Sequence, residues 1–600
     1  MILQSLVKYY EALAERNEIT TPGWCKAGVS YALVISETGE LKDIICLKFE
    51  TVVGKKKNLI PLPMNVPEMV TRSRNKVANF LCDNSGYFLG VDDKVDKNSG
   101  IEKFRISKEK HTTILKKIDC VFAKAIIKFF ETWEPSKAHE HSVLQHDWDA
   151  IVLGGGNLVF ELDGVFAHED NEIKEGWEKL QQNNKNDETG VCLVTGERTE
   201  IARLHNSIKK IQGAQASGAL LVSFNEPAFE SYGKEQSFNA PVSRFAVYAY
   251  TTALNYLLAH KMFTKISDTT IVSWADNADP GYQDTWNCAI ESTIDNQEIV
   301  NGVFDNLAKG KAIQIDTVEN NLSLEQQFSI LALAPNAARL SVRFFYQDTF
   351  ENIMLNIKKH YSRMEIVKPS YDTIKYLGVW RMLQETINKK SKNKEPIANM
   401  SASVLKAIIT NGRYPAALYQ GVLGRIRSEQ GATNKDKKVE QITRGRAAII
   451  KAYLIRNTNI NEEEITVALN ENSNNIAYTL GRTFSVLEQI QEAAYEKINT
   501  TIKDRYFNAA CATPASIFPI LLKLKNSHIR KLESGGKSKG MIVNFEKLLG
   551  SLQDKIVISE NESAYPKRLS LEDQGLFILG YYHQNQRKYE GKKVEEKVNE

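Results

Sequence analysis

The sequence predicts an α+β protein, with a mixed α/β N-terminal region followed by an all-α C-terminal helical bundle. Up to about residue 350, short apolar runs bounded by turn residues alternate with helical periodicity, without a regular βαβ repeat. From about residue 370 onward, strand patterns nearly vanish and short helical patterns dominate. A chain of 600 residues is too long for one hydrophobic core, so about three to five domains are expected.

Residues 1–150 are expected to form an N-terminal α+β domain that opens with an amphipathic helix. In residues 28–49, two apolar runs flank Glu-Thr-Gly-Glu, which predicts a β-hairpin. The stretch after it carries prolines at 61, 63 and 67 and is predicted to be an extended loop. Helical periodicity follows at 107–133.

Residues 151–370 are expected to form a second α+β region. Helices are predicted at 171–183 and at about 243–260, with a short apolar strand at 219–224 between them. The run that starts at residue 338 alternates like a strand and then continues with helical periodicity.

Residues 371–465 are predicted to form a basic helical region. The acidic, Asn-rich stretch 458–475 lacks a period and predicts a linker. Residues 466–600 are expected to form a C-terminal bundle, with about four helices between 478 and 590.

Composition excludes several classes of protein. Hydrophobic residues make up 42% and charged residues 25%, which is ordinary for a globular chain. No apolar run approaches the roughly 20 residues that span a bilayer, so no membrane association is expected. The seven cysteines form no C-x-x-C pair, which argues against a zinc knuckle or a disulfide framework. The N-terminus lacks a secretion signal, and a cytoplasmic location is therefore expected.

Charge is concentrated in two stretches, although the net charge is only +4. Residues 405–460 hold eleven Lys/Arg and three Asp/Glu, a local net charge of +8. Residues 48–76 hold seven and two, a local net charge of +5. Basic patches in a nearly neutral chain indicate polyanion contacts, while a solvated surface is the alternative interpretation.

Motifs for catalysis are weak, so no catalytic residue, metal or cofactor is predicted. The Gly-rich run at 152–162 lacks G-x-G-x-x-G spacing and is followed by a strand, not a helix. The histidines within 139–146 have no partner cysteine pair. The alternative is a metal-dependent nuclease that uses Asp276, Asp279 and Asp284 to bind Mg²⁺, although Asn-Asp-Pro-Gly in this run is also turn chemistry.

Long stretches of the chain are similar to one known family. They are "TRSRNKVANFLCDNSGYFLG" (71–90), "SFNEPAFESYGKEQSFNAPVSRFAVYAYTTALNYLL" (223–258), and the C-terminal runs at 480–524 and 569–584. Together with the opening "MILQSLVKYYEALAE", they resemble the large subunit of the type I-C (Dvulg subtype) CRISPR Cascade surveillance complex. Arg74 stands where the first motif usually has Gly, which puts a tight turn there in doubt.

The resemblance implies a role without catalysis. Such a subunit joins a guide crRNA and the other Cascade subunits, and reads the protospacer-adjacent motif (PAM) of double-stranded DNA. It helps to open the duplex, holds the displaced strand and recruits a helicase–nuclease, while base pairing reads the remaining sequence. The family also tends to make a separate small subunit from an internal start, for which Val467 in the predicted linker is a candidate.

The first stretch supplies PAM candidates. Arg72, Arg74 and Lys76 are predicted to neutralise phosphates, and Asn79 and Asn84 to contact base edges. The alternative is that this motif builds a strand edge and its cap. The residues predicted to clamp the DNA backbone upstream of it are Lys55, Lys56 and Lys57.

The loop at 224–243 supplies a second set of PAM candidates: Asn225, Tyr232, Lys234, Gln236 and Asn239. Amides and Lys offer hydrogen bonds to base edges, and a planar side chain can wedge between base pairs. The alternative is that the asparagines cap turns and the aromatic rings pack in the core.

The basic helical region supplies candidates for the backbone of the displaced strand or the heteroduplex. They are Arg425, Arg427, Arg444, Arg446 and Lys451. Arg444 and Lys451 are seven residues apart and share a helix face, with Ala, Ile and Leu elsewhere on the helix. Packing combined with solubility is the alternative explanation of the same pattern.

Overall fold

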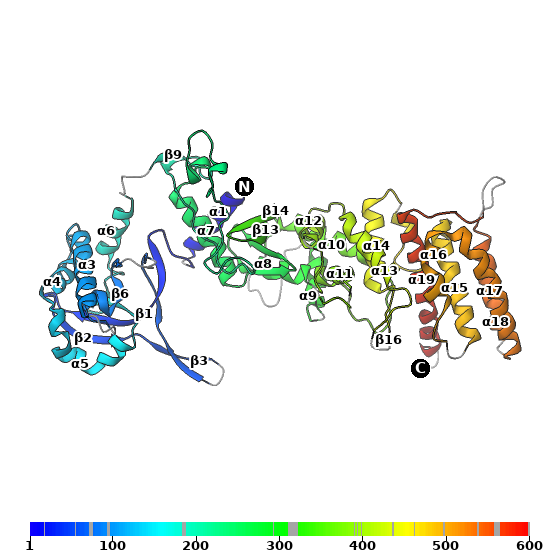
Figure 1. The fold of residues 1–600 in the computed structure, drawn as a ribbon, viewed down its shortest axis with the longest axis horizontal. Coiled ribbons are helices and arrows are strands. Elements are labelled where there is room, and N and C mark those ends of the chain that lie inside the picture. The colour runs from blue at the N-terminus through cyan, green and yellow to red at the C-terminus, as the bar shows by residue number, and fades with distance from the viewer. Residues whose placement is uncertain are drawn as a thin grey trace. The chain divides into compact units, whose positions relative to one another are not determined.

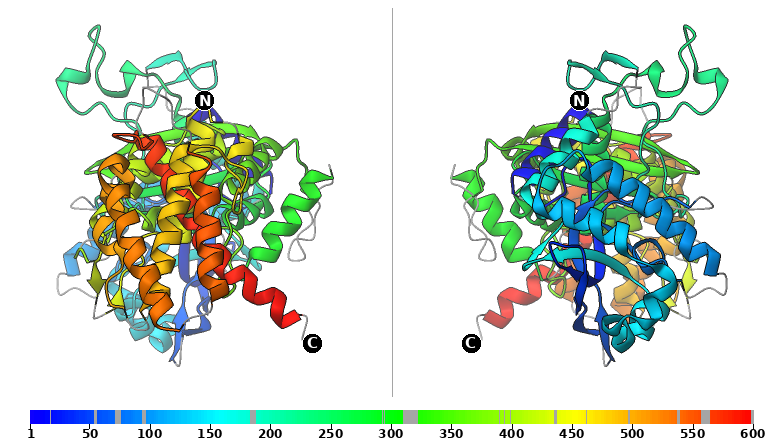
Figure 2. Two further views of the ribbon diagram at one scale, coloured as in Figure 1. Left: turned by 90° about the vertical axis from the view of Figure 1, so that its right-hand side faces the viewer. Right: turned by 90° about the vertical axis from the view of Figure 1, so that its left-hand side faces the viewer.

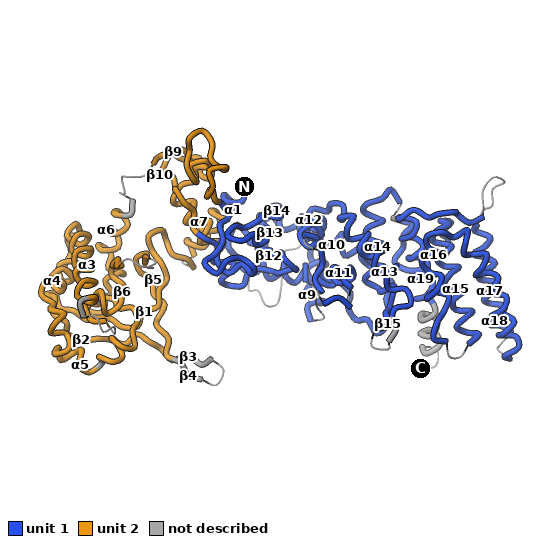
Figure 3. The backbone as a smooth tube through the Cα atoms, in the orientation of Figure 1, with its two compact units in different colours: residues 1–5, 207–222, 254–600 blue, residues 6–206, 223–253 orange. Residues whose placement is uncertain are grey.

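The computed structural model of the 600-residue chain confirms the α+β class (Figure 1). Its compact parts are two units (Figure 3): unit 1 comprises residues 1–5, 207–222 and 254–600, and unit 2 comprises residues 6–206 and 223–253. The predicted boundaries at residues 150, 370 and 465 stay predictions. The structure describes the backbone except at residues 17, 54–55, 71–75, 93–96, 183–187, 292, 294, 310–321, 389, 393, 398, 435–436, 461, 496–497, 537–538, 557–563 and 598–600. The side chains of 52–53, 56–58, 97–98, 147, 181–182, 433–434, 437–438, 462 and 588–597 also lie outside the description.

Unit 2 is built on a sheet in which six described strands take part, and the long strand β1 lies at its centre. β1 pairs antiparallel with β2 and β5 and parallel with β7, and β7 pairs antiparallel with β6 and β8. The hairpin predicted at 28–49 is therefore confirmed, whereas the prolines expected in a loop lie in or beside edge strand β5, where a missing N–H is tolerated. The strands are β1 (Trp24–Ile35), β2 (Leu41–Cys46), β5 (Leu62–Pro67), β6 (Cys82–Asn84), β7 (Asn157–Leu162) and β8 (Val165–Phe166).

The side chains of β1 alternate between two cores, and helices cover the face of the sheet that carries the larger core. Tyr31 and Leu33 join the larger core, which holds the Phe-rich side of α4, while Val29 and Ala32 face a smaller cluster with Val66. The helices of this part are α2 (Ser85–Phe88), α3 (Lys97–Leu115), α4 (Val121–Thr132), α5 (Ser142–Trp148) and α6 (Asn171–Gln182).

Short elements complete unit 2. A separate hairpin joins β3 (Phe49–Val53) to β4 (Lys56–Ile60), and another joins β9 (Thr189–Val191) to β10 (Arg198–Glu200). The loop after residue 223 holds two 3₁₀ turns, η3 (Pro227–Phe229) and η4 (Gln236–Asn239). Helices α1 (Ile2–Glu15) and α7 (Arg244–Ala259) each contribute residues to both units.

Unit 1 begins with an antiparallel sheet in the order β11-β12-β13-β14. The strand predicted at 219–224 is reduced to isolated bridges at Ala219 and Leu220. The strands are β11 (Phe263–Ile266), β12 (Thr269–Ala275), β13 (Gln327–Asn336) and β14 (Arg339–Thr349), and a two-residue pair follows later, β15 (Thr433–Asn434) with β16 (Lys437–Lys438).

Helices form the rest of unit 1 around one continuous hydrophobic core, which runs from Ile266 to Tyr582. The predicted bundle contains five described helices, which lie side by side (Figure 2), and it shares this core with the helices before it. Gly481 and Gly580 let α15 and α19 approach closely, since a Cβ on either would meet the backbone of the other helix. The helices are α8 (Pro280–Ile290), α9 (Gln297–Ala308), α10 (Phe350–Met364), α11 (Val379–Gln384), α12 (Met400–Ile409), α13 (Ala416–Ser428), α14 (Arg444–Asn457), α15 (Ile476–Ala494), α16 (Ile502–Ala512), α17 (Pro514–Ser534), α18 (Lys539–Gln553) and α19 (Leu571–Lys597).

None of the helices in the described ranges is both long enough and apolar enough to cross a membrane.

Candidate nucleic-acid interface

The first motif folds into a buried hydrogen-bond network. Asn79 is 1% exposed, and its side-chain oxygen accepts a bond from the Val70 backbone N–H at 2.9 Å. The Asn79 backbone N–H donates to Asp83, which is itself fully buried, at 2.8 Å. The Asn79 side chain is thus bonded to the backbone within the protein, which suits a buried amide because an unpaired one is costly, and its contact with a DNA base edge stays a prediction.

A strained turn lies inside this network. Leu81 has a φ of 56°, and the Cys82 N–H donates to the Phe80 carbonyl at 2.8 Å, which defines a γ-turn of the rare kind with positive φ. The Leu81 N–H donates to Nε2 of His111 at 3.0 Å, so Nδ1 carries the proton and donates to Ser107. Burial lowers the pKa of His111 to about 3, which keeps the ring neutral.

The remaining predicted residues of the first motif cap a helix, form a surface ion pair or lie outside the described residues. Asn84 caps α2 by accepting from the Gly86 N–H at 3.1 Å, as the alternative interpretation expected. Lys76 forms a surface ion pair with Glu102. The other predicted cations are outside the description: Arg72, Arg74 and Lys55 lie beyond the described backbone, and Lys56 and Lys57 lie on β4 without described side chains.

The loop at 224–243 displays an aromatic side chain at the tip of a tight turn. Ser231 and Lys234 form a bridge, and the two residues between them, Tyr232 and Gly233, both have positive φ, 55° and 69°. This is the pattern of a type I′ hairpin turn, which Gly tolerates and a Tyr adopts only with strain. The Tyr232 side chain is 100% exposed.

Side chains of the loop itself brace this turn. Asn239 accepts from the Ser231 N–H at 2.8 Å and donates to the carbonyls of Lys234 and Gln236 at 2.7 and 2.9 Å. Gln236 accepts from Arg203 at 2.8 Å. The structure therefore gives Asn239 and Gln236 bracing roles, while Asn225, Tyr232 and Lys234 are exposed.

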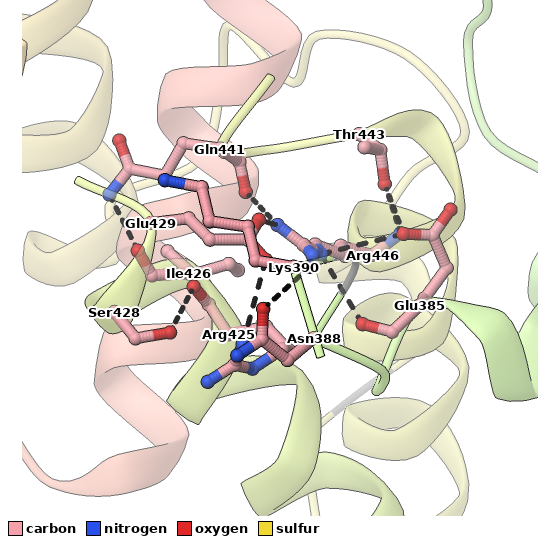
Figure 4. Close-up of polar contacts among 10 residues, drawn as sticks. All are labelled: Glu385, Asn388, Lys390, Arg425, Ile426, Ser428, Glu429, Gln441, Thr443 and Arg446. Carbon is pink, nitrogen blue, oxygen red and sulfur yellow. Dashed lines mark hydrogen bonds and ion pairs between the residues drawn. The ribbon is translucent and has the colours of Figure 1, made fainter. Parts of the chain in front are cut away.

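Two of the third set of candidates, Arg446 and Lys451, are buried inside the protein. Arg446 is 0% exposed, and its guanidinium donates to Glu429 at 2.6 Å and to the Gln441 carbonyl at 2.8 Å, with Glu385 at 3.4 Å (Figure 4). Lys451 is 3% exposed and donates to the Arg363 carbonyl. A buried charge needs such partners, so these side chains are not available to a polyanion.

The other three arginines of this set are also paired. Arg444 bonds Asp372 at 2.8 Å and the carbonyls of Ile374 and Lys375. Arg427 donates to Gln574 of α19, and Arg425 lies 3.8 Å from Glu429 with its side chain 21% exposed. Helices α10, α13 and α19 cover α14 on several sides, and the sequence of α14 alone does not predict this packing.

Of the three carboxylates considered for a nuclease, Asp279 has a structural role. Asp279 caps α8 by accepting from the Gly281 N–H at 2.9 Å. Burial and the neighbouring Asp279 raise the pKa of Asp284, and Asp276 is 8% exposed. Within the described residues, no group of three or more His, Cys, Asp or Glu side chains is arranged to hold a metal ion.

These features define an α+β protein with an exposed aromatic turn in unit 2 and a cationic helix in unit 1 whose Arg444 and Arg446 pair with carboxylates. The family model described as CRISPR-associated protein (Cas_Csd1) matches residues 6–589. The chain therefore belongs to this family of CRISPR-associated proteins, which indicates the large subunit of a Cascade that works with other Cas subunits and a crRNA. No curated protein matches the chain.

Proposed function

We propose that this chain is the non-catalytic large subunit of a type I-C surveillance complex in the cytoplasm. In this proposal it recognises the PAM in double-stranded DNA, helps to open the duplex, stabilises the displaced strand and recruits the helicase–nuclease for antiviral defence. Family membership supports the CRISPR setting. The DNA contact is supported above all by one observation, the fully exposed Tyr232 on its strained turn.

Tyr232 has the properties of a side chain that separates base pairs. A wedge must be planar or apolar, must project from the protein, and must not fold back when it meets the duplex. The ring of Tyr232 is completely exposed, and its turn is closed by the Lys234 N–H bond to Ser231 and braced by Asn239. Strain that the surrounding structure maintains is typical of functional positions.

The charge of this loop favours groove contact over phosphate contact. Residues 224–243 carry three Glu and one Lys. Glu235 lies 3.8 Å from Arg203, and Glu230 accepts from the Gln236 N–H. We therefore assign the phosphate contacts to the basic stretch 48–76, and base-edge or stacking contacts to Asn225, Tyr232 and Lys234.

The test uses the assembled complex with its guide crRNA. Target duplexes carry a PAM selected from a library of randomised flanking sequences, and 2-aminopurine beside the PAM reports unstacking. Tyr232→Ala is expected to slow opening, and Tyr232→Phe to keep it, because the ring and not the hydroxyl forms the wedge. Wild-type opening kinetics in Tyr232→Ala would remove this residue from the mechanism.

The non-catalytic character is tested on the isolated chain. We expect no cleavage of duplex or single-stranded DNA in the presence of Mg²⁺. Metal-dependent cleavage that disappears in Asp276→Ala would instead favour the nuclease interpretation.

A separate small subunit from an internal start is also part of the proposal. Val467 lies in the segment between α14 and α15, where such a start is expected, and its carbonyl accepts from the Val367 N–H. Mass spectrometry of the purified complex is expected to find a fragment of about 130 residues. Its absence would contradict this part alone.

A further inference from the structure

One stretch of unit 1 exposes aromatic rings among cations. Tyr371 is 81% exposed and Trp380 is 39% exposed. We call this stretch the aromatic–basic segment; its members are Tyr371, Lys375, Trp380, Arg381, Lys390 and Lys392, all of them exposed.

The backbone of the aromatic–basic segment is fixed from inside. Arg444 donates to the carbonyls of Ile374 and Lys375 at 2.6 and 2.9 Å, and Gln297 accepts from the N–H groups of Lys375 and Tyr376. The Trp380 N–H donates to Glu291 at 3.1 Å. The backbone is thus anchored to neighbouring helices on the inside, while the two rings remain exposed.

The charge that this stretch presents to solvent is positive. Among the described residues of 368–394, five Lys/Arg are exposed, whereas the two Asp/Glu are only partly exposed. Both acids are engaged: Asp372 pairs with Arg444, and Glu385 receives a bond from Thr443 and lies 3.4 Å from Arg446. Glu291 of the neighbouring helix end accepts from the Trp380 N–H, so its carboxylate is also occupied.

We propose that the aromatic–basic segment binds a single-stranded polynucleotide, with Tyr371 and Trp380 stacking on bases and its Lys and Arg side chains following the phosphates. Unstacked bases present the flat faces that such rings need, and a cationic path beside aromatic rings is the usual combination in single-strand binding. The two rings are nine residues apart, at most about 30 Å along an extended chain. That is within the length of the roughly 4–16 nucleotides tracked by one single-strand-binding fold.

This inference rests on the proposed function only in that a nucleic acid is the expected partner. It gives the strand-holding role to exposed residues in place of the buried Arg446 and Lys451. The strand is either displaced DNA or guide RNA, which share this chemistry and which the experiment separates.

The experiment measures fluorescence anisotropy of the full chain with labelled oligo-dT and oligo-rU of about 12 nucleotides, and with a blunt duplex of the same length. Tyr371→Ala and Trp380→Ala are each expected to weaken single-strand binding by about 5- to 150-fold, the effect of losing one base–aromatic stack. Tyr371→Phe and Trp380→Phe keep a ring and should stay near wild type. The oligomer whose affinity falls more identifies the strand.

Two further variants separate stacking from charge. Ile397→Ala removes an exposed apolar side chain of the same region that has no aromatic face, and it should bind like wild type. Lys390→Glu with Lys392→Glu should weaken binding and reduce its salt dependence. Wild-type affinity in both Ala variants, or equal losses in the Ala and Phe variants, would overturn the proposal. These binding measurements do not depend on PAM recognition. A complex that fails to discriminate its PAM would therefore contradict the proposed function but not this inference.

Discussion

The cationic helix α14 and the loop at 224–243 are both predicted from the sequence to contact DNA, but the structure places their side chains differently. In α14, Arg446 and Lys451 are 0% and 3% exposed and are bonded within the protein. In the loop, Tyr232 is 100% exposed, and the side chains of Asn239 and Gln236 brace the turn that carries it. A local excess of charge therefore does not identify a nucleic-acid surface, because the partners that neutralise it come from distant parts of the chain.

The contrast predicts its largest effect at Arg446. Arg446→Ala leaves Glu429 and Gln441 without their buried donor, so the free energy of unfolding should fall by about 3–5 kcal/mol. Urea unfolding of the full chain, followed by circular dichroism, measures this change. Arg425→Ala is the matched control, since its ion pair with Glu429 is looser and more exposed, and it should cost no more than about 1 kcal/mol. Equal losses of stability in the two variants would contradict the expected difference between the buried Arg446 and the partly exposed Arg425.

Substitution of Asn79 should lower stability, as at Arg446, and, unlike substitution of Tyr232, should not alter DNA recognition. Asn79→Ala removes the buried side chain that accepts from the Val70 N–H and is expected to lower stability by about 1–3 kcal/mol. Stability is measured by thermal unfolding, and the PAM preference of the folded fraction in a library selection should not change. A shifted preference without loss of stability would return Asn79 to the surface that reads DNA.

The sequence predicts elements well because their signals are local. The helix predicted to carry Arg444 and Lys451 is found as α14, Arg444–Asn457, and the hairpin at 28–49 is β1 with β2. It does not predict which helix faces are covered, since the partners of α14 come from α10, α13 and α19. It also does not predict the positive φ of Tyr232 and Leu81, because packing and hydrogen bonds from elsewhere impose them.

Acid should destabilise the motif around His111. The folded protein keeps His111 neutral, with a pKa of about 3, while the unfolded chain takes up a proton below about pH 6.5. Stability is therefore lost as the pH falls from about 6.5 toward 3, by up to about 1.4 kcal/mol per pH unit for this ring. Unfolding of His111→Gln, which does not titrate, should show a correspondingly flatter pH dependence than wild type. Parallel curves for the two proteins would mean that His111 is not held neutral.

The smallest effect on stability, together with a large one on function, is expected at Tyr232. Tyr232→Gly removes the ring and also relieves the positive φ that a Tyr tolerates poorly, while Gly233 and the bond from Lys234 to Ser231 still close the turn. The melting temperature should be unchanged or should rise by no more than about 2 °C, because no buried contact is lost. Opening of the PAM-proximal duplex by the assembled complex should nevertheless fall as far as it does in Tyr232→Ala. A variant that melts at the wild-type temperature and opens DNA at the wild-type rate would mean that the exposed ring has no role, and the proposed DNA contact of this loop would then depend on Asn225 and Lys234 alone.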